Sequence, residues 1–268
     1  MRRYRFSYQT IVRYDRLVSN HDFMLRCMPL DYKQQRLVDE HIHLLGGAEY
    51  QRSEDNFGNT IVYGSMKQKH DIFVVAVCGV VDCLEYKVEE EKPSRVFLSS
   101  TPKTMCTSYM ACWANEVPSE GSSLEQALAL SSYISSYMSY APSVTNTETT
   151  ASESFELRQG VCQDYSHLLI SLCRERGILA RYVAGFMAGT GETHAWVEVH
   201  CEGAWYGIDP THNTLIEYGY VKVSHGRDAA DCSVVRGMHR GRSAQSTQVR
   251  VIVEQLDARY DYREFQSM

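Results

Sequence analysis

The sequence turns from loop to helix at Gly160-Val161-Cys162-Gln163-Asp164-Tyr165. The glycine permits a tight entry, and the apolar residues that follow recur at helical spacing. Gly177 is suited to end the helix, because glycine adopts the left-handed backbone that closes many helices. The apolar face of this predicted helix is formed by Leu168, Leu169, Leu172 and Cys173.

Cys162 stands at or beside the start of this helix. Free backbone N–H groups and the positive end of the helix dipole favour a thiolate over a thiol. Cys162 would then be nucleophilic near neutral pH, and its own backbone N–H would help to hold a developing oxyanion. Position alone also fits a small buried side chain, which is the ordinary role of a cysteine.

A histidine and an aspartate downstream favour a nucleophilic role for Cys162 over a purely structural one. Two strand-like segments, starting at His194 and ending at Asp209, flank the turn-like Cys201-Glu202-Gly203-Ala204. If residues 201–204 form a hairpin loop, facing residues have numbers that sum to 405. Asp209 then lies opposite Trp196, and His194 shares the face of Trp196, so His194 and Asp209 become diagonal neighbours. A slip of one residue would separate them.

This arrangement predicts covalent acyl transfer. A carboxylate holds a histidine in one tautomer and stabilises its imidazolium, and a thiol within reach supplies the nucleophile. Gln163, Asp164 and Trp196 are candidate supporting residues, with Asp164 also suited to a structural role in the first turn of the helix. We expect no metal and no cofactor, since His200, His212 and His225 match no common ligand spacing and are expected in surface or loop roles.

Outward from this centre the pattern divides into strands, helices and strands. Residues 4–100 have the alternation and turns of an antiparallel β-sandwich, and residues 122–140 form a second helix with Ser122 and Glu125 as a capping box. Strand patterns return from residue 181 onward. We therefore predict an α+β protein with an N-terminal β domain at 1–100 and a catalytic domain at 101–268 that includes closing C-terminal strands.

Composition excludes several classes of protein. The 268 residues are 44% hydrophobic and 22% charged, which argues against general disorder, and the net charge of −6 argues against a nucleic-acid binder. The longest apolar run, residues 72–81, is half the length of a membrane-spanning helix, so we expect no membrane association. Nine cysteines without framework spacing, after a basic N-terminus that leads into no apolar segment, predict free thiols and a cytoplasmic location.

The three core blocks resemble the transglutaminase core, and the whole chain resembles the bacterial transglutaminase-like proteins described as candidate cysteine proteases. The N-terminal half carries two further stretches of that family, Ser19-Asn20 through Arg26 to Pro29 and the turn Asp55–Asn59; Gly226–Asp231 matches its G-R-D-x-x-D segment. Leu179 replaces a proline common after Gly-Ile. The core blocks are Gly160–His167, Gly177–Phe186, and His194–Glu198 with Ile208–Thr211.

The resemblance implies a papain-like fold with Cys162 as nucleophile, His194 as general base and acid, and Asp209 as the residue that orients His194. It implies a thiol enzyme acting on peptide or glutamine-type amides in a peptide or protein, with hydrolysis by a protease or deamidase favoured. Cross-linking by a protein-glutamine γ-glutamyltransferase and a non-catalytic protein-binding module are the alternatives. The second oxyanion donor, the role of the N-terminal domain and the oligomeric state stay open.

Overall fold

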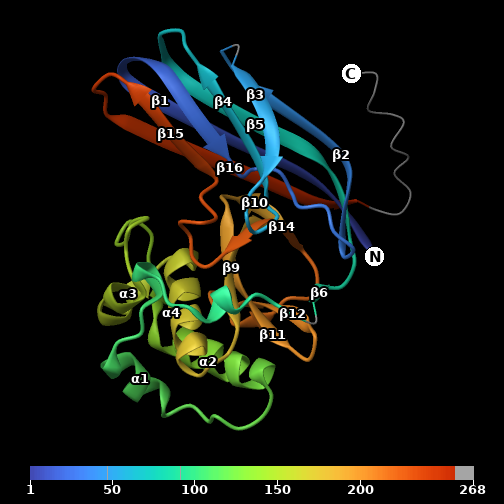
Figure 1. Cartoon of the computed structure of the whole chain (residues 1–268), viewed down its shortest axis with the longest axis vertical. Helices are drawn as coiled ribbons and strands as arrows, with labels where there is room; N and C mark the ends of the chain where they lie inside the picture. The colour runs from blue at the N-terminus through green and yellow to red at the C-terminus, as the bar shows by residue number, and fades with distance from the viewer. Residues whose placement is uncertain (47, 91, 257–268) are drawn as a thin grey trace.

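Two large antiparallel sheets, one short parallel strand pair and one group of helices make up the chain, which we describe from a computed structural model over residues 1–46, 48–90 and 92–256. The N-terminal strands form a long curved sandwich, and the helices gather at the opposite end of the molecule (Figure 1). The α+β class predicted from the sequence is confirmed. All nine cysteines are free thiols.

The N-terminal sheet is organised by one very long strand, β1, Arg2–Leu25. Its first half pairs with β5 and β16, and its second half pairs with β4 and β15, so the sheet bends into two layers around a shared core. Alternate side chains of β1, including Tyr4, Phe6 and Tyr8, are buried in that core. The strands of this sheet are β2 (Gln35–Leu44), β3 (Glu49–Glu54), β4 (Thr60–Met66), β5 (His70–Cys83), β10 (Gly189–Gly191), β15 (Val235–Arg240) and β16 (Gln245–Leu256).

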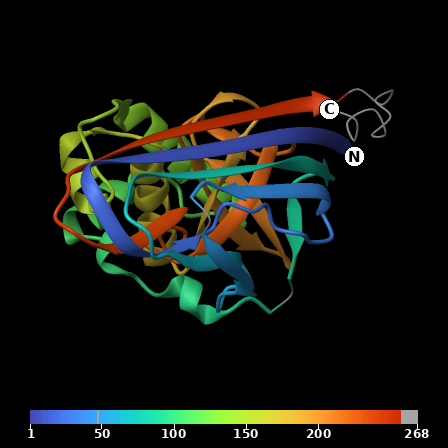
Figure 2. The same cartoon turned by 90° about the horizontal axis from the view of Figure 1, so that it is seen from above.

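The C-terminal strands complete the N-terminal sheet. β16 pairs with β1 from Tyr14↔Gln245 to Arg3↔Leu256, and the two strands run side by side along the molecule (Figure 2). We expected these strands in the catalytic domain, and this part of the domain division needs correction. The local residue pattern predicts a strand but not the strand with which it pairs, because pairing between the two ends of a chain depends on the tertiary structure.

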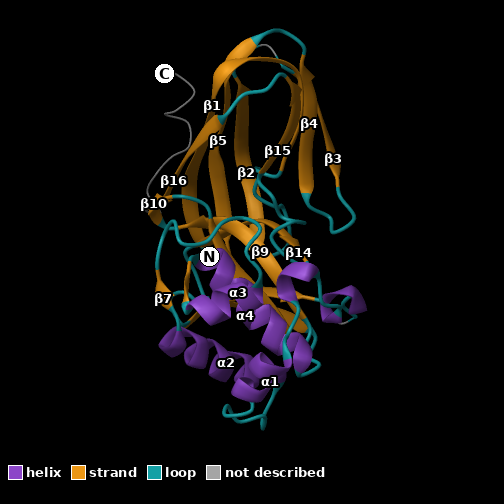
Figure 3. Cartoon of the chain, turned by 90° about the vertical axis from the view of Figure 1, so that its left-hand side faces the viewer, coloured by secondary structure: helices purple, strands orange, loops and turns teal. Residues whose placement is uncertain are grey.

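The second sheet has the order β13-β12-β11-β9-β14, with β6 on β12. Helices cover one face of it (Figure 3), and Leu168 and Leu172 pack there against Val197 and Val199. Its other face encloses a smaller core of Tyr86, Val183, Trp196 and Ile216. The strands are β6 (Lys87–Glu89), β9 (Ala180–Met187), β11 (His194–Cys201), β12 (Ala204–Asp209), β13 (Thr214–Leu215) and β14 (Tyr220–Gly226).

The helices follow the capping signals of the sequence. α2, Ser123–Tyr137, begins at the predicted Ser122–Glu125 capping box, and α4, Cys162–Glu175, ends just before Gly177 with its φ of 70°. α1 (Ser108–Ala114) and α3 (Ala151–Leu157) were not predicted, although Thr150 and Glu153 form a capping box that marks the start of α3. Two 3₁₀ turns, Arg95–Leu98 and Pro102–Thr104, precede α1. Of the helices in the described residues, none is long and apolar enough to cross a membrane.

Candidate active site

Cys162 is the first residue of α4 and is partly accessible to solvent. The turn that leads to it is fixed by Asp164, whose Oδ2 accepts the N–H of Val161 at 2.8 Å and the hydroxyl of Thr145 at 2.7 Å. Gly160 is required there, because a Cβ at this position would lie 2.6 Å from Asp164 Oδ2. The structural role predicted for Asp164 thus includes holding the backbone beside the cysteine.

The hairpin that carries His194 and Asp209 has the predicted register. β11 and β12 pair from Val197↔Ile208 to Cys201↔Ala204, and every facing pair sums to 405. Its two-residue turn uses Glu202 and Gly203, both with positive φ (47° and 80°), as tight hairpin turns require. His194 and Asp209 consequently lie on the same face at one end of the hairpin.

His194 and Asp209 are in direct contact. Nε2 of His194 lies 2.7 Å from Oδ2 of Asp209, and the side chains are 10% and 0% exposed. The histidine is also close enough to Cys162 for the cysteine to raise its pKa. Since Nε2 is engaged by the carboxylate, Nδ1 is the ring nitrogen left for the thiol.

Electrostatics favour an ion pair at this centre. Burial by itself lowers the pKa of His194, but the hydrogen bonds to Asp209 and Cys162 raise it to about 10. Burial alone would raise the pKa of Asp209, yet its bonds with His194, His212 and Tyr220 hold that pKa well below the ordinary range. His194 is therefore held as an imidazolium beside a carboxylate.

Two partners of Asp209 were missed. Nδ1 of His212 lies 2.7 Å from Asp209 Oδ2, and the hydroxyl of Tyr220 donates to the same oxygen at 2.8 Å. The sequence placed His212 in a surface or loop role, and its side chain is indeed 49% exposed, but its ring is bonded to the buried carboxylate. The one sequence feature that could have indicated this contact is the position of His212 three residues after Asp209.

The donor atoms of His194, Asp209 and His212 lie within 4.8 Å of one another, a spacing compatible with a metal ion. Both histidines are, however, hydrogen-bonded to Asp209 Oδ2, and Oδ1 accepts the backbone N–H groups of Thr211 and His212. These contacts account for the carboxylate without a cation. Of the other two histidines, His200 lies 2.6 Å from the carbonyl of Glu90, and His225 is partly buried in β14, where burial lowers its pKa.

The remaining candidates lie around this centre. Gln163 donates its amide to the carbonyl of Asn146 at 3.4 Å, and no contact joins it to His194 or Asp209 within the described residues. Trp196 is fully buried, with its ring centroid 6.4 Å from that of His194, and its indole N–H donates to the Tyr86 hydroxyl. Trp196 is thus a packing neighbour of His194 within the core.

Tyr140 is a further residue that sequence reasoning missed. It pairs with Gly160 where β7 (Ser139–Tyr140) runs parallel to β8 (Gln159–Gly160), and it is 57% exposed. Partial burial and the neighbouring Cys162 raise the pKa of its hydroxyl. An exposed phenol therefore lies near the thiol.

A buried ionic cluster lies beneath the hairpin. Glu198 receives hydrogen bonds from Lys222, Tyr86 and Arg181, and Glu198 and Lys222 are almost completely excluded from solvent. Burial opposes the charge of Glu198, but Arg181 and Lys222 lower its pKa to about 2. The cluster joins β9, β11 and β14 on the face of the sheet that also carries His194.

Comparison with known proteins agrees with this architecture. A crystal structure of a candidate cysteine protease from Cytophaga hutchinsonii superposes with a TM-score of 0.79 at 24% identity, covering 97% of this chain and 93% of that one, which shows the same fold. An uncharacterized protein of Mycobacterium leprae is 24% identical over 255 residues, 85% of this chain and 89% of its own length. An uncharacterized protein of Mycobacterium tuberculosis is 25% identical over 273 residues, 88% and 87% of the two chains.

Two family descriptions match separate parts of the sequence. Residues 4–82 match the bacterial transglutaminase-like N-terminal region, which is built from the first strands of the sandwich. Residues 111–210 match the transglutaminase-like superfamily core, which contains Cys162, His194 and Asp209. The chain therefore combines a bacterial transglutaminase-like N-terminal region with a core of the transglutaminase-like superfamily, in this order.

Proposed function

We propose that this protein is a thiol-dependent acyl-transfer enzyme that acts on peptide or glutamine-type amides through Cys162, His194 and Asp209. The observation that carries the proposal is the placement of His194, whose ring lies 2.7 Å from the Asp209 carboxylate and close enough to Cys162 for the cysteine to raise the pKa of the histidine. A partly accessible thiol, an imidazolium and a buried carboxylate are the groups that covalent acyl transfer requires.

The first half of the reaction forms a thioester. The Cys162 thiolate attacks the amide carbonyl, and the oxygen of the tetrahedral intermediate gains negative charge beside the backbone N–H of Cys162. His194 gives its Nδ1 proton to the departing amine as the C–N bond breaks. Asp209 keeps the ring oriented throughout and stabilises its charge.

The second half returns the enzyme to its starting state. His194, now neutral, takes a proton from the incoming nucleophile as that nucleophile attacks the thioester carbonyl, and the C–S bond then breaks. Water as the nucleophile gives a carboxylic acid, as in a peptidase or deamidase, whereas a primary amine gives a new amide, as in a cross-linking enzyme. We favour water, the outcome that the family resemblance implies for a bacterial protein.

A mass-spectrometric screen tests the proposal and separates its outcomes. The purified chain is incubated with a peptide library containing glutamine, with and without added methylamine, and Cys162→Ala is the parallel sample. Cleaved backbone identifies a peptidase, conversion of glutamine to glutamate a deamidase, and a methylamine adduct a transferase. Cys112→Ala, which removes an exposed thiol far from His194 in sequence, is the matched control.

The proposal fails if Cys162→Ala retains any activity that the screen detects. If the library stays intact while Cys162 alkylates no faster than Cys112, the protein is better described as a binding module on this scaffold. We also propose that the substrate is a peptide or a protein. The nine free thiols lead us to expect a cytoplasmic location.

A further inference from the structure

Asp209 is held by more hydrogen bonds than the orientation of one histidine requires. Oδ1 accepts two backbone N–H groups, from Thr211 at 2.9 Å and His212 at 3.2 Å. Oδ2 accepts hydrogen bonds from Nε2 of His194 at 2.7 Å, from Nδ1 of His212 at 2.7 Å and from the Tyr220 hydroxyl at 2.8 Å. The carboxylate is fully buried, so no solvent is available to replace a missing donor.

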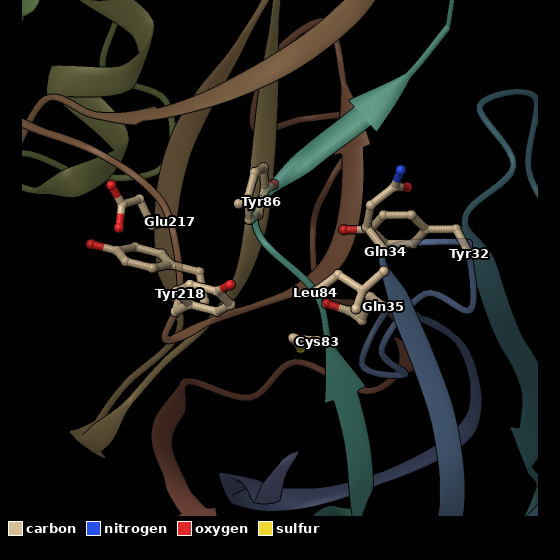
Figure 4. A pocket seen from close by; sticks show the side chains of 9 residues that line it. Tyr32, Gln34, Gln35, Cys83, Leu84, Tyr86, Glu217 and Tyr218 are labelled. Atoms are coloured by element: carbon tan, nitrogen blue, oxygen red, sulfur yellow. The ribbon is translucent and has the colours of Figure 1, made fainter. Parts of the chain in front are cut away.

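Tyr220 reaches Asp209 only because the sheet curls. It is the first residue of β14, whereas Asp209 is the last residue of β12, and strands β11 and β9 lie between them in the sheet order. Its ring packs edge-on against Trp196 at 5.3 Å and also lines a small pocket with Tyr32, Gln35 and Tyr86, between the two parts of the molecule (Figure 4). Replacing Tyr220 by phenylalanine would remove the hydroxyl and keep this packing.

His212 contacts the same oxygen from a solvent-exposed turn. It lies in the turn after β12, with its side chain 49% exposed, and its ring centroid is 5.4 Å from that of His194. Pro210 and the two backbone bonds to Oδ1 fix the conformation of this turn. The turn then places Nδ1 of His212 next to Asp209. Within the described residues, the His212 side chain makes no other hydrogen bond.

We propose that His212 and Tyr220 are positioning residues that act on the reaction through Asp209, by fixing Oδ2 against Nε2 of His194. This inference rests on the proposed function, since it concerns the residues that set the charge of His194. The backbone bonds to Oδ1 restrain rotation of the carboxylate from one side. The two side-chain donors at Oδ2 add to this restraint beside His194 and help to keep the buried group ionised.

Loss of either donor weakens the support of the His194 imidazolium and so reduces the thiolate at Cys162. Alkylation of Cys162 by iodoacetamide measures this thiolate without any knowledge of the substrate. The rate is followed for the Cys162 peptide by mass spectrometry at pH 6, where the thiolate depends on the imidazolium, and at pH 10, where even an ordinary cysteine is ionised. The value at pH 10 reports accessibility alone.

Three variants test the assignment, and two more serve as controls. Tyr220→Phe and His212→Ala should each lower the pH 6 rate about 5-fold or more, since hydrogen bonds to charged groups are among the stronger ones, with the pH 10 rate within about 2-fold of wild type. His212→Asn should recover most of the loss, because Nδ2 of asparagine can take the place of Nδ1. Tyr206→Phe and His200→Asn, on the same hairpin but away from Asp209, serve as controls and should leave both rates unchanged.

The decisive comparison uses an Asp209→Ala background. If His212 and Tyr220 act through Asp209, neither Tyr220→Phe nor His212→Ala should lower the pH 6 rate further once the carboxylate is gone. Additional losses in that background, or normal pH 6 rates in the two single variants, overturn the assignment. Failure of the proposed function looks different, because Cys162 of the wild-type protein would then show no enhanced alkylation at pH 6.

Discussion

His194 begins β11 and Asp209 ends β12, and the shared hairpin brings Nε2 of the histidine to 2.7 Å from Oδ2 of the aspartate. The contact depends on the parity of the strand register, because a shift of one residue would turn one of the two side chains to the opposite face.

Replacing His194 by alanine should remove the selective reactivity of Cys162. Among nine cysteines, Cys162 should be alkylated first by limiting iodoacetamide near neutral pH, and His194→Ala should slow it to the rate of the exposed Cys112. Peptide mass spectrometry quantifies both sites in one sample. Equal labelling of Cys162 in the wild type and the variant would contradict an activated thiol.

Replacing Asp209 by asparagine should lower turnover by about 10²- to 10⁴-fold, since an amide supports the wrong tautomer of the histidine. Hydrogen bonds with Asp209 and Cys162 outweigh burial and raise the pKa of His194 to about 10, so the wild-type activity should fall only above about that pH, as the imidazolium loses its proton. In Asp209→Asn this basic limb should move to lower pH. A basic limb at the same pH in both proteins would show that another group controls it.

Adding a methyl group at Gly160 should damage the entry to α4. A Cβ there would lie 2.6 Å from the side chain of Asp164, so Gly160→Ala should cost about 1–3 kcal/mol of unfolding free energy and slow alkylation of Cys162. Gly191→Ala is the matched control, because a Cβ at that position meets nothing within 4 Å. Urea unfolding measures both variants, and equal midpoints would refute the steric argument.

Removing the charge of Glu198 should destabilise the fold strongly. The change would leave the buried Lys222 without its carboxylate and Arg181 with only the longer contact to Glu90 at 3.7 Å, so Glu198→Ala should cost about 3–5 kcal/mol. Glu254→Ala, which removes the partner of Arg5 at the surface, should have a far smaller effect. Because the Glu198 pKa is lowered to about 2 against burial, its contribution is complete above about pH 4.5 and is lost as the pH falls toward 2.

Dialysis against EDTA should leave turnover unchanged. The nearby donor atoms of His194, Asp209 and His212 are committed to hydrogen bonds with one another, and the proposed reaction uses only a thiol, an imidazole and a carboxylate. Activity before and after dialysis, with and without added Zn²⁺, makes the comparison. Loss on dialysis and recovery with Zn²⁺ would instead indicate a bound cation at these residues.

The sequence predicted features that depend on neighbours along the chain. The capping box at Ser122, the helix that begins at Cys162 and the β11–β12 register all follow from turn chemistry and periodicity over a few residues. The family resemblance, carried by short blocks around Cys162, His194 and Asp209, was available for the same reason. α3 was also within reach through Thr150 and Glu153, but its seven residues are too few for a clear apolar period.

The local chemistry could thus be read from the residues alone: a thiol at a helix start, and a histidine and an aspartate on one face of a hairpin. Three further relationships needed the folded chain: Cys162 lies close to that histidine, Tyr220 and His212 share the carboxylate, and β16 returns to pair with β1. Propensity and register act between residues that are close in the chain. The partners across a curled sheet or between the two ends of the chain are selected by packing of the whole core.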